Sequence, residues 1–147
     1  MNIFEALRIS HQTQRALVDQ LVATEGDSRE RSVVFTALRK ELQAHETAEE
    51  RCFYVPLIEH DATVDTARHG IAEHHEMDEM VEELADTEMS SPAWLVKARA
   101  LRHKVHHHLD EEEQVFFQLA GKVLSAAQKT ALAKAYEAEF TTQRVQA

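Results

Sequence analysis

The chain has 147 residues, 44% of them hydrophobic and 29% charged, and a formal net charge of −10 at pH 7. This length and composition predict one globular domain, residues 1–147, with a single core. The negative charge excludes nucleic acid and anionic membrane surfaces as partners, because both require a basic face. No run approaches the roughly 18 apolar residues of a membrane span. A single cysteine and the lack of a signal-peptide pattern predict a cytoplasmic protein.

Only three glycines and two prolines interrupt the chain, which favours long helices with few breaks. The first helix is predicted over about residues 2–23, because Asn2 and Glu5 have the spacing of a capping box. Its apolar residues recur at intervals of three and four, and His11 occupies one of these inward positions. A polar residue therefore lies where a leucine would be expected.

The second predicted helix has Ser28 as its N-cap and is ended or kinked by Pro56. His45 and Glu49 both lie on its apolar stripe, so this helix also presents polar groups to the interior. Cys52 lies on the same side and is predicted to be a buried structural thiol rather than a redox residue.

Two further helices follow. The third covers about residues 64–87, with His74 at an inward position and Gly70 as a mild defect. The fourth begins at Pro92, after the N-cap Ser91, and ends at about Ala120 with Gly121 as its stop signal. Its predicted inward residues are Trp94, Leu95, Ala98, Leu101, Val105, His108, Glu112, Val115 and Leu119.

An internal repeat relates these helices to one another. The segment HKVHHHLDEEEQVFF contains His108 and Glu112, one helical turn apart, and AHETAEERCFY contains His45 and Glu49 at the same spacing. An offset of 63 residues aligns 1–60 with 64–123 without a gap, with many more identities than the roughly four or five expected by chance. Examples are His11/His74, Val18/Val81, Leu21/Leu84, Ser28/Ser91, Arg39/Arg102, Glu50/Glu113 and Phe53/Phe116. The repeat predicts an all-α, up-down four-helix bundle, with a short fifth C-terminal helix over residues 125–144 that covers one end or flank.

Six polar residues thus share one predicted interior layer. Burying them without partners would cost roughly 1–3 kcal/mol for each group. Imidazole nitrogens and carboxylate oxygens suit iron, manganese or zinc, and the set supplies about eight bonds to metal. Two six-coordinate ions sharing an oxo or hydroxo bridge need about ten, which leaves about two positions open to solvent or a small ligand. The alternative is a core of histidines hydrogen-bonded to the two glutamates.

The chain resembles the hemerythrin-like proteins of the HHE cation-binding family over its whole length. The resemblance lies in the histidines of LRISHQTQRALV and IAEHHEMDEMV and in the motifs AHETAEERCFYVP and HHHLDEEEQVFF. It implies an up-down bundle that holds a non-haem di-iron centre of two iron ions. The residues that it implies as metal ligands are the terminal histidines His11, His45, His74 and His108 and the bridging glutamates Glu49 and Glu112.

The sequence departs from this family in two places. Oxygen-carrying hemerythrins have His-x-x-x-His on the third helix and His-x-x-x-x-Asp on the fourth. In this chain the residue one helical turn after His74 is Asp78 instead of histidine. One histidine is missing, so reversible oxygen transport is not expected unless Asp78 or another histidine replaces it. Ser10 stands where many members have aspartate, which would alter the hydrogen bond that orients His11.

Neighbouring residues leave alternatives open. His75 could replace His74 and His107 could replace His108, but only one of each adjacent pair can face the site, and the repeat favours His74 and His108. The other histidines, His60, His69, His103 and His106, are predicted to be solvated or one step removed from the metal. A charged outer face is predicted for Glu50, Glu79, Glu82, Glu83, Glu111 and Glu113, with Glu50 and Glu113 alternatively pairing with Arg39 or Arg102. The aromatic residues Phe53, Tyr54, Trp94 and Phe116 either wall the site or pack the core.

Three functions follow from these features. The first is a di-iron protein that binds or reacts with oxygen, peroxide or nitric oxide, in stress response or sensing. The second is iron storage, donation or iron-centre repair without catalysis of its own. The third is a structural bundle with incidental metal. The sequence does not indicate whether the protein is an enzyme or what its oligomeric state is.

Overall fold

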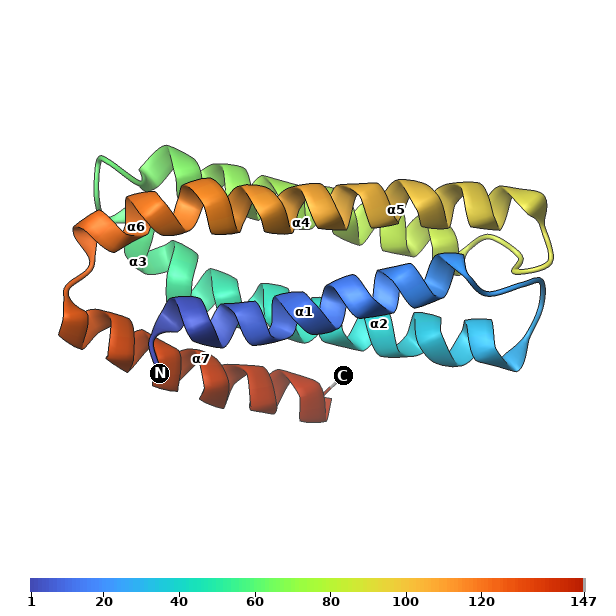
Figure 1. Cartoon of the computed structure of the whole chain (residues 1–147), viewed down its shortest axis with the longest axis horizontal. Coiled ribbons are helices and arrows are strands. Elements are labelled where there is room, and N and C mark those ends of the chain that lie inside the picture. The colour runs from blue at the N-terminus through green and yellow to red at the C-terminus, as the bar shows by residue number, and fades with distance from the viewer. Residues whose placement is uncertain (147) are drawn as a thin grey trace.

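The structure is a computed structural model that describes residues 1–146, and this part of the chain is all-helical (Figure 1). Four helical rods run alternately up and down, and a fifth helix lies beside two of them. The bounds are α1 Ile3–Val22, α2 Arg29–Glu49 continued by η1 Glu50–Tyr54 and α3 Val55–Ile58, α4 Val64–Ala85, α5 Pro92–Glu111 continued by η2 Glu112–Phe116 and α6 Phe117–Val123, and α7 Ala126–Gln146. The predicted all-α bundle is confirmed.

Polar residues start the helices where the sequence predicted them. The Asn2 carboxamide oxygen accepts a hydrogen bond from the Glu5 N–H at 2.9 Å, and the Glu5 carboxylate accepts one from the Asn2 N–H at 2.9 Å. Ser28 and Ser91 accept hydrogen bonds from first-turn N–H groups of α2 and α5 at 3.1 and 3.2 Å. Each such cap contributes about 0.5–2 kcal/mol to helix stability.

The segments η1 and η2 are π-helical, which the regular spacing of the sequence did not predict. A π turn contains more residues than an α turn and shifts the register of the side chains that follow. Two consecutive aromatic residues therefore face the interior in each segment: Phe53 and Tyr54 are 0% exposed, and Phe116 and Phe117 are 4% and 5% exposed. Val115, predicted to face inward, is turned out by the same shift and is 49% exposed.

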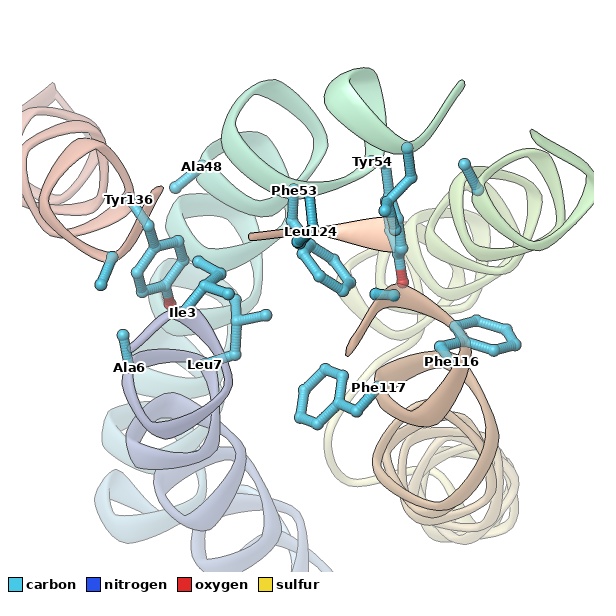
Figure 2. Packing of buried hydrophobic residues seen from close by; sticks show 14 residues of the cluster. Ile3, Ala6, Leu7, Ala48, Phe53, Tyr54, Phe116, Phe117, Leu124 and Tyr136 are labelled. Carbon is cyan, nitrogen blue, oxygen red and sulfur yellow. The ribbon is translucent and has the colours of Figure 1, made fainter. Parts of the chain in front are cut away.

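Two apolar clusters fill the bundle, one at each end. The cluster at the α3 and α6 end comprises Ile3, Ala6, Leu7, Ala48, Phe53, Tyr54, Leu57, Ala67, Phe116, Phe117, Ala120, Leu124, Ala133 and Tyr136 (Figure 2). The other comprises Val18, Leu21, Val34, Leu38, Leu42, Met77, Val81, Leu84, Trp94, Ala98, Leu101, Val105 and Leu109. On α1, His11 lies between Leu7 of the first cluster and Val18 of the second. The predicted polar layer is thus enclosed by apolar packing on both sides.

The C-terminal helix lies close to its predicted range and covers one flank of the bundle, as predicted. Helix α7 covers Ala126–Gln146, 21 residues against the predicted range 125–144, and it lies along the flank formed by α1 and α2. It buries Tyr136 in the cluster that contains Ala6 and Ala48. The preceding helix also continues past Gly121 to Val123, so Gly121 is not its stop.

Gly70 is a packing requirement rather than a defect. A Cβ atom at this position would overlap the ring of Tyr54, so only glycine lets Tyr54 lie against α4. Cys52 is partly buried and packs against the same cluster, which is a milder burial than predicted. Among residues 1–146, no helix has both the length and the apolar character needed to cross a membrane.

Candidate metal centre

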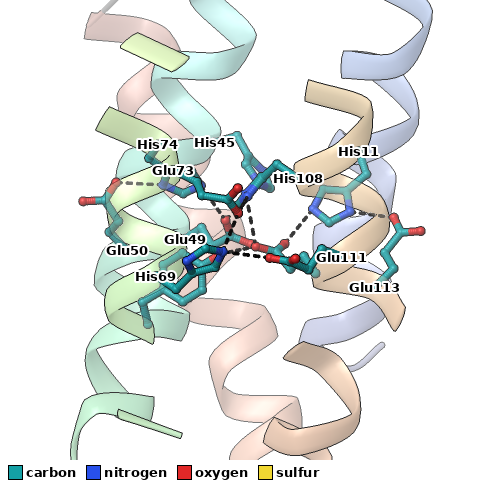
Figure 3. A network of polar contacts seen from close by, with 12 residues as sticks. His11, His45, Glu49, Glu50, His69, Glu73, His74, His108, Glu111 and Glu113 are labelled. Atoms are coloured by element: carbon teal, nitrogen blue, oxygen red, sulfur yellow. Dashed lines mark hydrogen bonds and ion pairs between the residues drawn. The ribbon is translucent and has the colours of Figure 1, made fainter. Parts of the chain in front are cut away.

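The six residues predicted as ligands meet in one layer of the bundle (Figure 3). They project from all four rods: His11 from α1, His45 and Glu49 from α2, His74 from α4, His108 from α5, and Glu112 from the start of η2. Each of the six is at most 1% exposed. The structure therefore brings together the whole predicted set in a site closed to bulk water.

The four histidines aim the same ring atom at the two glutamates. His45 Nε2 and His74 Nε2 lie 3.4 and 3.0 Å from Glu49 Oε1. His11 Nε2 lies 3.0 Å from Glu112 Oε1, and His108 Nε2 lies 3.5 Å from Glu112 Oε2. These contacts lack hydrogen-bonding geometry, and none of the four Nε2 atoms has a hydrogen-bond partner within residues 1–146. Three glutamate oxygens share this state, namely Glu49 Oε1, Glu49 Oε2 and Glu112 Oε1.

These unpartnered atoms fit metal ions better than they fit a core of hydrogen-bonded pairs. Each buried polar atom without a partner costs roughly 1–3 kcal/mol, and the layer contains seven of them. The atoms fall into two groups whose members lie within 4.8 Å of one another. One group contains His11 and His45, the other contains His74 and His108, and both contain Glu49 and Glu112. A carboxylate common to two groups has the placement of a bridge between two ions.

The second ring nitrogen of each histidine has its own partner outside the layer. His11 Nδ1 lies 2.6 Å from Glu113 Oε2, and His74 Nδ1 lies 2.8 Å from Glu50 Oε2. His108 Nδ1 lies 2.9 Å from Glu73 Oε1, and His45 Nδ1 lies 2.8 Å from the hydroxyl of Tyr136. All four Nδ1 atoms thus have a hydrogen-bond partner. An ionised carboxylate only accepts, so in the neutral rings of His11, His74 and His108 the proton lies on Nδ1 and the lone pair of Nε2 is left for a cation.

The repeat explains two of these partners. Glu50 and Glu113 are equivalent residues, and each crosses to the histidine of the opposite half. The predicted pairing of Glu50 and Glu113 with Arg39 or Arg102 was wrong, since Arg39 pairs with Glu82 and Arg102 with Asp19. Their recurrence in the repeat was the signal that could have identified them.

The other two partners break the repeat and were not predicted. The residue equivalent to Glu73 is Ser10, which donates a hydrogen bond to Glu41 at 2.6 Å instead of reaching a histidine. His45 is served by Tyr136, which lies on α7 and outside the repeat. The partner of His11 Nδ1 is Glu113. His11 is therefore held by a hydrogen bond even though Ser10 stands where many family members have aspartate.

Tyr54 also breaks the symmetry, because its equivalent in the second half is Phe117. Its ring packs against that of His74, with centroids 5.5 Å apart, and its buried hydroxyl donates a hydrogen bond to Glu112. Tyr54 therefore forms an aromatic wall of the site, which was one of the two predicted alternatives. It also makes a polar contact with Glu112, a predicted bridging ligand.

Burial and the neighbouring charges shift the pKa values of the predicted ligands in different directions. Burial lowers the pKa of His45 to about 4. For His11, burial acts in the same direction, but the carboxylates of Glu112 and Glu113 outweigh it and raise the pKa to about 9. Burial and the Glu49 carboxylate raise the pKa of Glu112 to about 8. Burial opposes the charge of Glu49, yet His45 and the other polar neighbours hold its pKa well below the usual range.

The alternatives that the sequence left open point away from the layer. The side chains of His75 and His107 are 75% and 58% exposed, and His75 instead contacts Glu79. Asp78 is exposed and belongs to neither ligand group. The structure therefore turns His74 and His108 inward, in agreement with the repeat register.

Comparison with known proteins agrees with this architecture. Residues 2–120 match the family described as Hemerythrin HHE cation binding domain. A crystal structure of a Hemerythrin HHE cation binding domain-containing protein from Mycobacterium kansasii superimposes with a TM-score of 0.89 at 23% sequence identity, over 99% of this chain and 89% of that one. At this identity the likeness shows a common fold. The sequence matches none of the curated proteins with which it was compared.

Proposed function

We propose that the chain, which belongs to the Hemerythrin HHE cation binding domain family, holds a non-haem di-iron centre. This centre would bind or react with oxygen, peroxide or nitric oxide. The observation that carries the proposal is the convergence of four unpartnered Nε2 atoms on two glutamates that belong to both ligand groups. A buried layer with this many unpartnered donors gains most from two ions that share the carboxylates.

In this proposal the histidines are terminal ligands, two for each ion, and the glutamates are bridges. His11 and His45 would hold one ion, and His74 and His108 the other. Glu49 and Glu112 would span both. These six supply about eight bonds. With an oxo or hydroxo bridge shared by both ions, about two of the positions that six-coordinate ions offer would stay available to a small ligand.

A pair of iron ions would supply redox chemistry and open coordination positions. The chain supplies orientation through the four Nδ1 partners, and outer partners of this kind typically change metal affinity about 10–100-fold when removed. The 0% exposure of Glu49 and Glu112 keeps bulk water from the layer. The Tyr54 hydroxyl donates its hydrogen bond to Glu112 and so orients one of the two proposed bridging carboxylates.

Anaerobic titration with ferrous iron tests the proposal. We expect uptake of about two iron ions per chain, because the ligands form two related half-sites. Visible spectra recorded before and after addition of oxygen, peroxide or nitric oxide should then change in proportion to the bound iron. Uptake of a single zinc ion without iron would overturn the di-iron proposal. Bound iron that transfers to a chelator without any spectral response to these ligands would favour storage or donation instead.

A further inference from the structure

A second group of potential ligands lies at the surface beside the buried layer. His69 and Glu73 are one turn apart on α4, and Glu111 faces them from α5 (Figure 3). His69 Nε2 is 2.9 Å from Glu111 Oε1 and 3.4 Å from Glu73 Oε1. Ligand atoms that each lie about 2.1 Å from a tetrahedral ion are separated by roughly 3.4 Å, so these three need only small adjustments to share a cation.

The burial of the three residues is graded from solvent to interior. The side chain of His69 is 53% exposed, that of Glu111 is 28% exposed, and that of Glu73 is 5% exposed. His69 also packs its ring edge-on against Phe116, at 5.9 Å between centroids, which limits its rotation. A nitrogen and two carboxylate groups form a donor set that suits divalent transition metals.

Glu73 connects this group with the buried layer. Its Oε1 atom lies 3.4 Å from His69 Nε2 and 2.9 Å from His108 Nδ1, so one oxygen contacts both sites. Its Oε2 atom accepts a hydrogen bond from Lys104 at 3.1 Å, which occupies the oxygen that points away from His69. The surface group is therefore one carboxylate away from a predicted ligand of the centre.

The repeat shows that this group is not a general feature of the fold. The equivalents of His69, Glu73 and Glu111 in the first half are Ala6, Ser10 and Ala48. These three are at most 4% exposed, and Ala6 and Ala48 pack in the cluster that contains Tyr136 of α7. On the flank that α7 covers, two of the positions hold alanine, which has no ligand atom, and the hydroxyl of Ser10 is hydrogen-bonded to Glu41. On the α4 and α5 flank, they hold three potential ligands, of which His69 and Glu111 reach solvent while Glu73 is buried.

We propose that His69, Glu73 and Glu111 bind a divalent transition-metal cation at the surface, and that cations pass from this site into the buried centre. The second part rests on the proposed di-iron centre, whereas the first does not. A cation held here is concentrated next to the layer that it fills.

Cobalt(II) titration of the full chain, followed by calorimetry, tests the surface site. The test variant is H69A/E111A, and Glu73 is kept because it also holds His108. The matched control is H75A/E79A, an exposed His–Glu pair 3.0 Å apart on α4 that belongs to no ligand group within residues 1–146. We expect about three cobalt ions per chain in the wild type and control and about two in H69A/E111A.

The other stoichiometries separate the two proposals. Two ions in all three proteins would overturn the surface site while the buried centre stands. One ion in the wild type and control and none in H69A/E111A would support the surface site and overturn the buried centre.

The rate of filling tests the route. With ferrous iron below saturation, H69A/E111A should fill roughly tenfold or more slowly than the control, because a cluster of negative charge raises cation association by at least that factor. The final iron content of the buried centre should be the same in both. Equal filling rates would overturn the route.

Discussion

Adjacent histidines in this chain have opposite environments, and this difference decides what each can do. His74 is 1% exposed with an unpartnered Nε2 atom, whereas the side chain of His75 is 75% exposed and contacts Glu79. We expect H74A to lower iron affinity by at least the roughly 10–100-fold typical of outer partners, because it removes a ligand, and H75A to leave affinity unchanged. H108A and H107A should differ in the same way. Equal losses within either pair, measured by iron titration, would show that the inward histidines are not ligands.

Gly70 gives a residue-scale test of packing beside the centre. An alanine there would gain about 1 kcal/mol of helix propensity, but its Cβ atom must displace the ring of Tyr54, which costs about 1–3 kcal/mol for overpacking. We therefore expect G70A to be destabilising in chemical denaturation. G121A is the control, since nothing within 4 Å of its Cβ position is found in the described chain, and it should stabilise the protein by roughly 0.5–1 kcal/mol.

The same G70A substitution made in a Y54L variant tests whether the ring of Tyr54 causes the loss of stability. In the Y54L variant the ring is gone, so G70A should cost less free energy of unfolding than it does in the wild type. The same cost in both backgrounds would mean that the ring of Tyr54 does not set the penalty.

At the scale of elements, α7 does more than cover the bundle. It is the helix that supplies Tyr136, whose hydroxyl is the partner of His45 Nδ1 at 2.8 Å. We expect Y136F to weaken iron binding about 10–100-fold, since the ring and its packing remain but the orienting hydrogen bond is lost. The affinity is measured by competition with a chelator. F140L, which alters α7 beside Tyr136 without touching His45, is the control, and an equal loss there would assign the effect to packing of the helix.

The π-helical segments show why elements cannot be inferred from spacing alone. Both begin where a predicted bridging glutamate lies, after Glu49 and at Glu112. The longer turn lets Glu49 stay inward while Phe53 and Tyr54 both reach the core. The same change on η2 accounts for the exposure of Val115. Regular helical geometry would have turned one residue of each aromatic pair toward solvent.

For the whole molecule, cation binding should be coupled to stability, because the buried layer lies between two apolar clusters and exists only in the folded chain. Free iron at 100 times its Kd would add about 2.7 kcal/mol to the free energy of unfolding, which corresponds to a rise of roughly 5–11 °C in Tm for a chain of this size. A chelator should reverse the rise. Thermal melts that superimpose with and without iron would contradict a shared interior site.

Protonation should be coupled to the same event. In the metal-free chain, the pKa of His11 is raised to about 9 and that of Glu112 to about 8, so both carry a proton at pH 7 that a cation must displace. We therefore expect proton release on binding and an iron affinity that rises from pH 7 to pH 9. A pH indicator in weak buffer measures the release. A pH-independent affinity across this window would show that neither group becomes a ligand.

The sequence by itself determined the helices, the bundle and the layer of six polar residues. These depend on periodicity along one helix and on a repeat of 63 residues, and both are properties of the chain alone. The repeat also selected His74 and His108 over their neighbours, and the structure turns both inward. The assignment of the six residues as ligands stays a prediction until metal is measured.

Only the tertiary structure decided the surroundings of that layer. Glu73 reaches His108 from 35 residues away, and Tyr136 reaches His45 from 91 residues away. Such contacts depend on how far each helix is rotated and shifted against its neighbours, which spacing within one helix does not encode. The position of α7 also could not be predicted from the sequence, because its apolar face could pack on either flank of a repeated bundle. By covering α1 and α2, it leaves the flank with His69, Glu73 and Glu111 open to solvent.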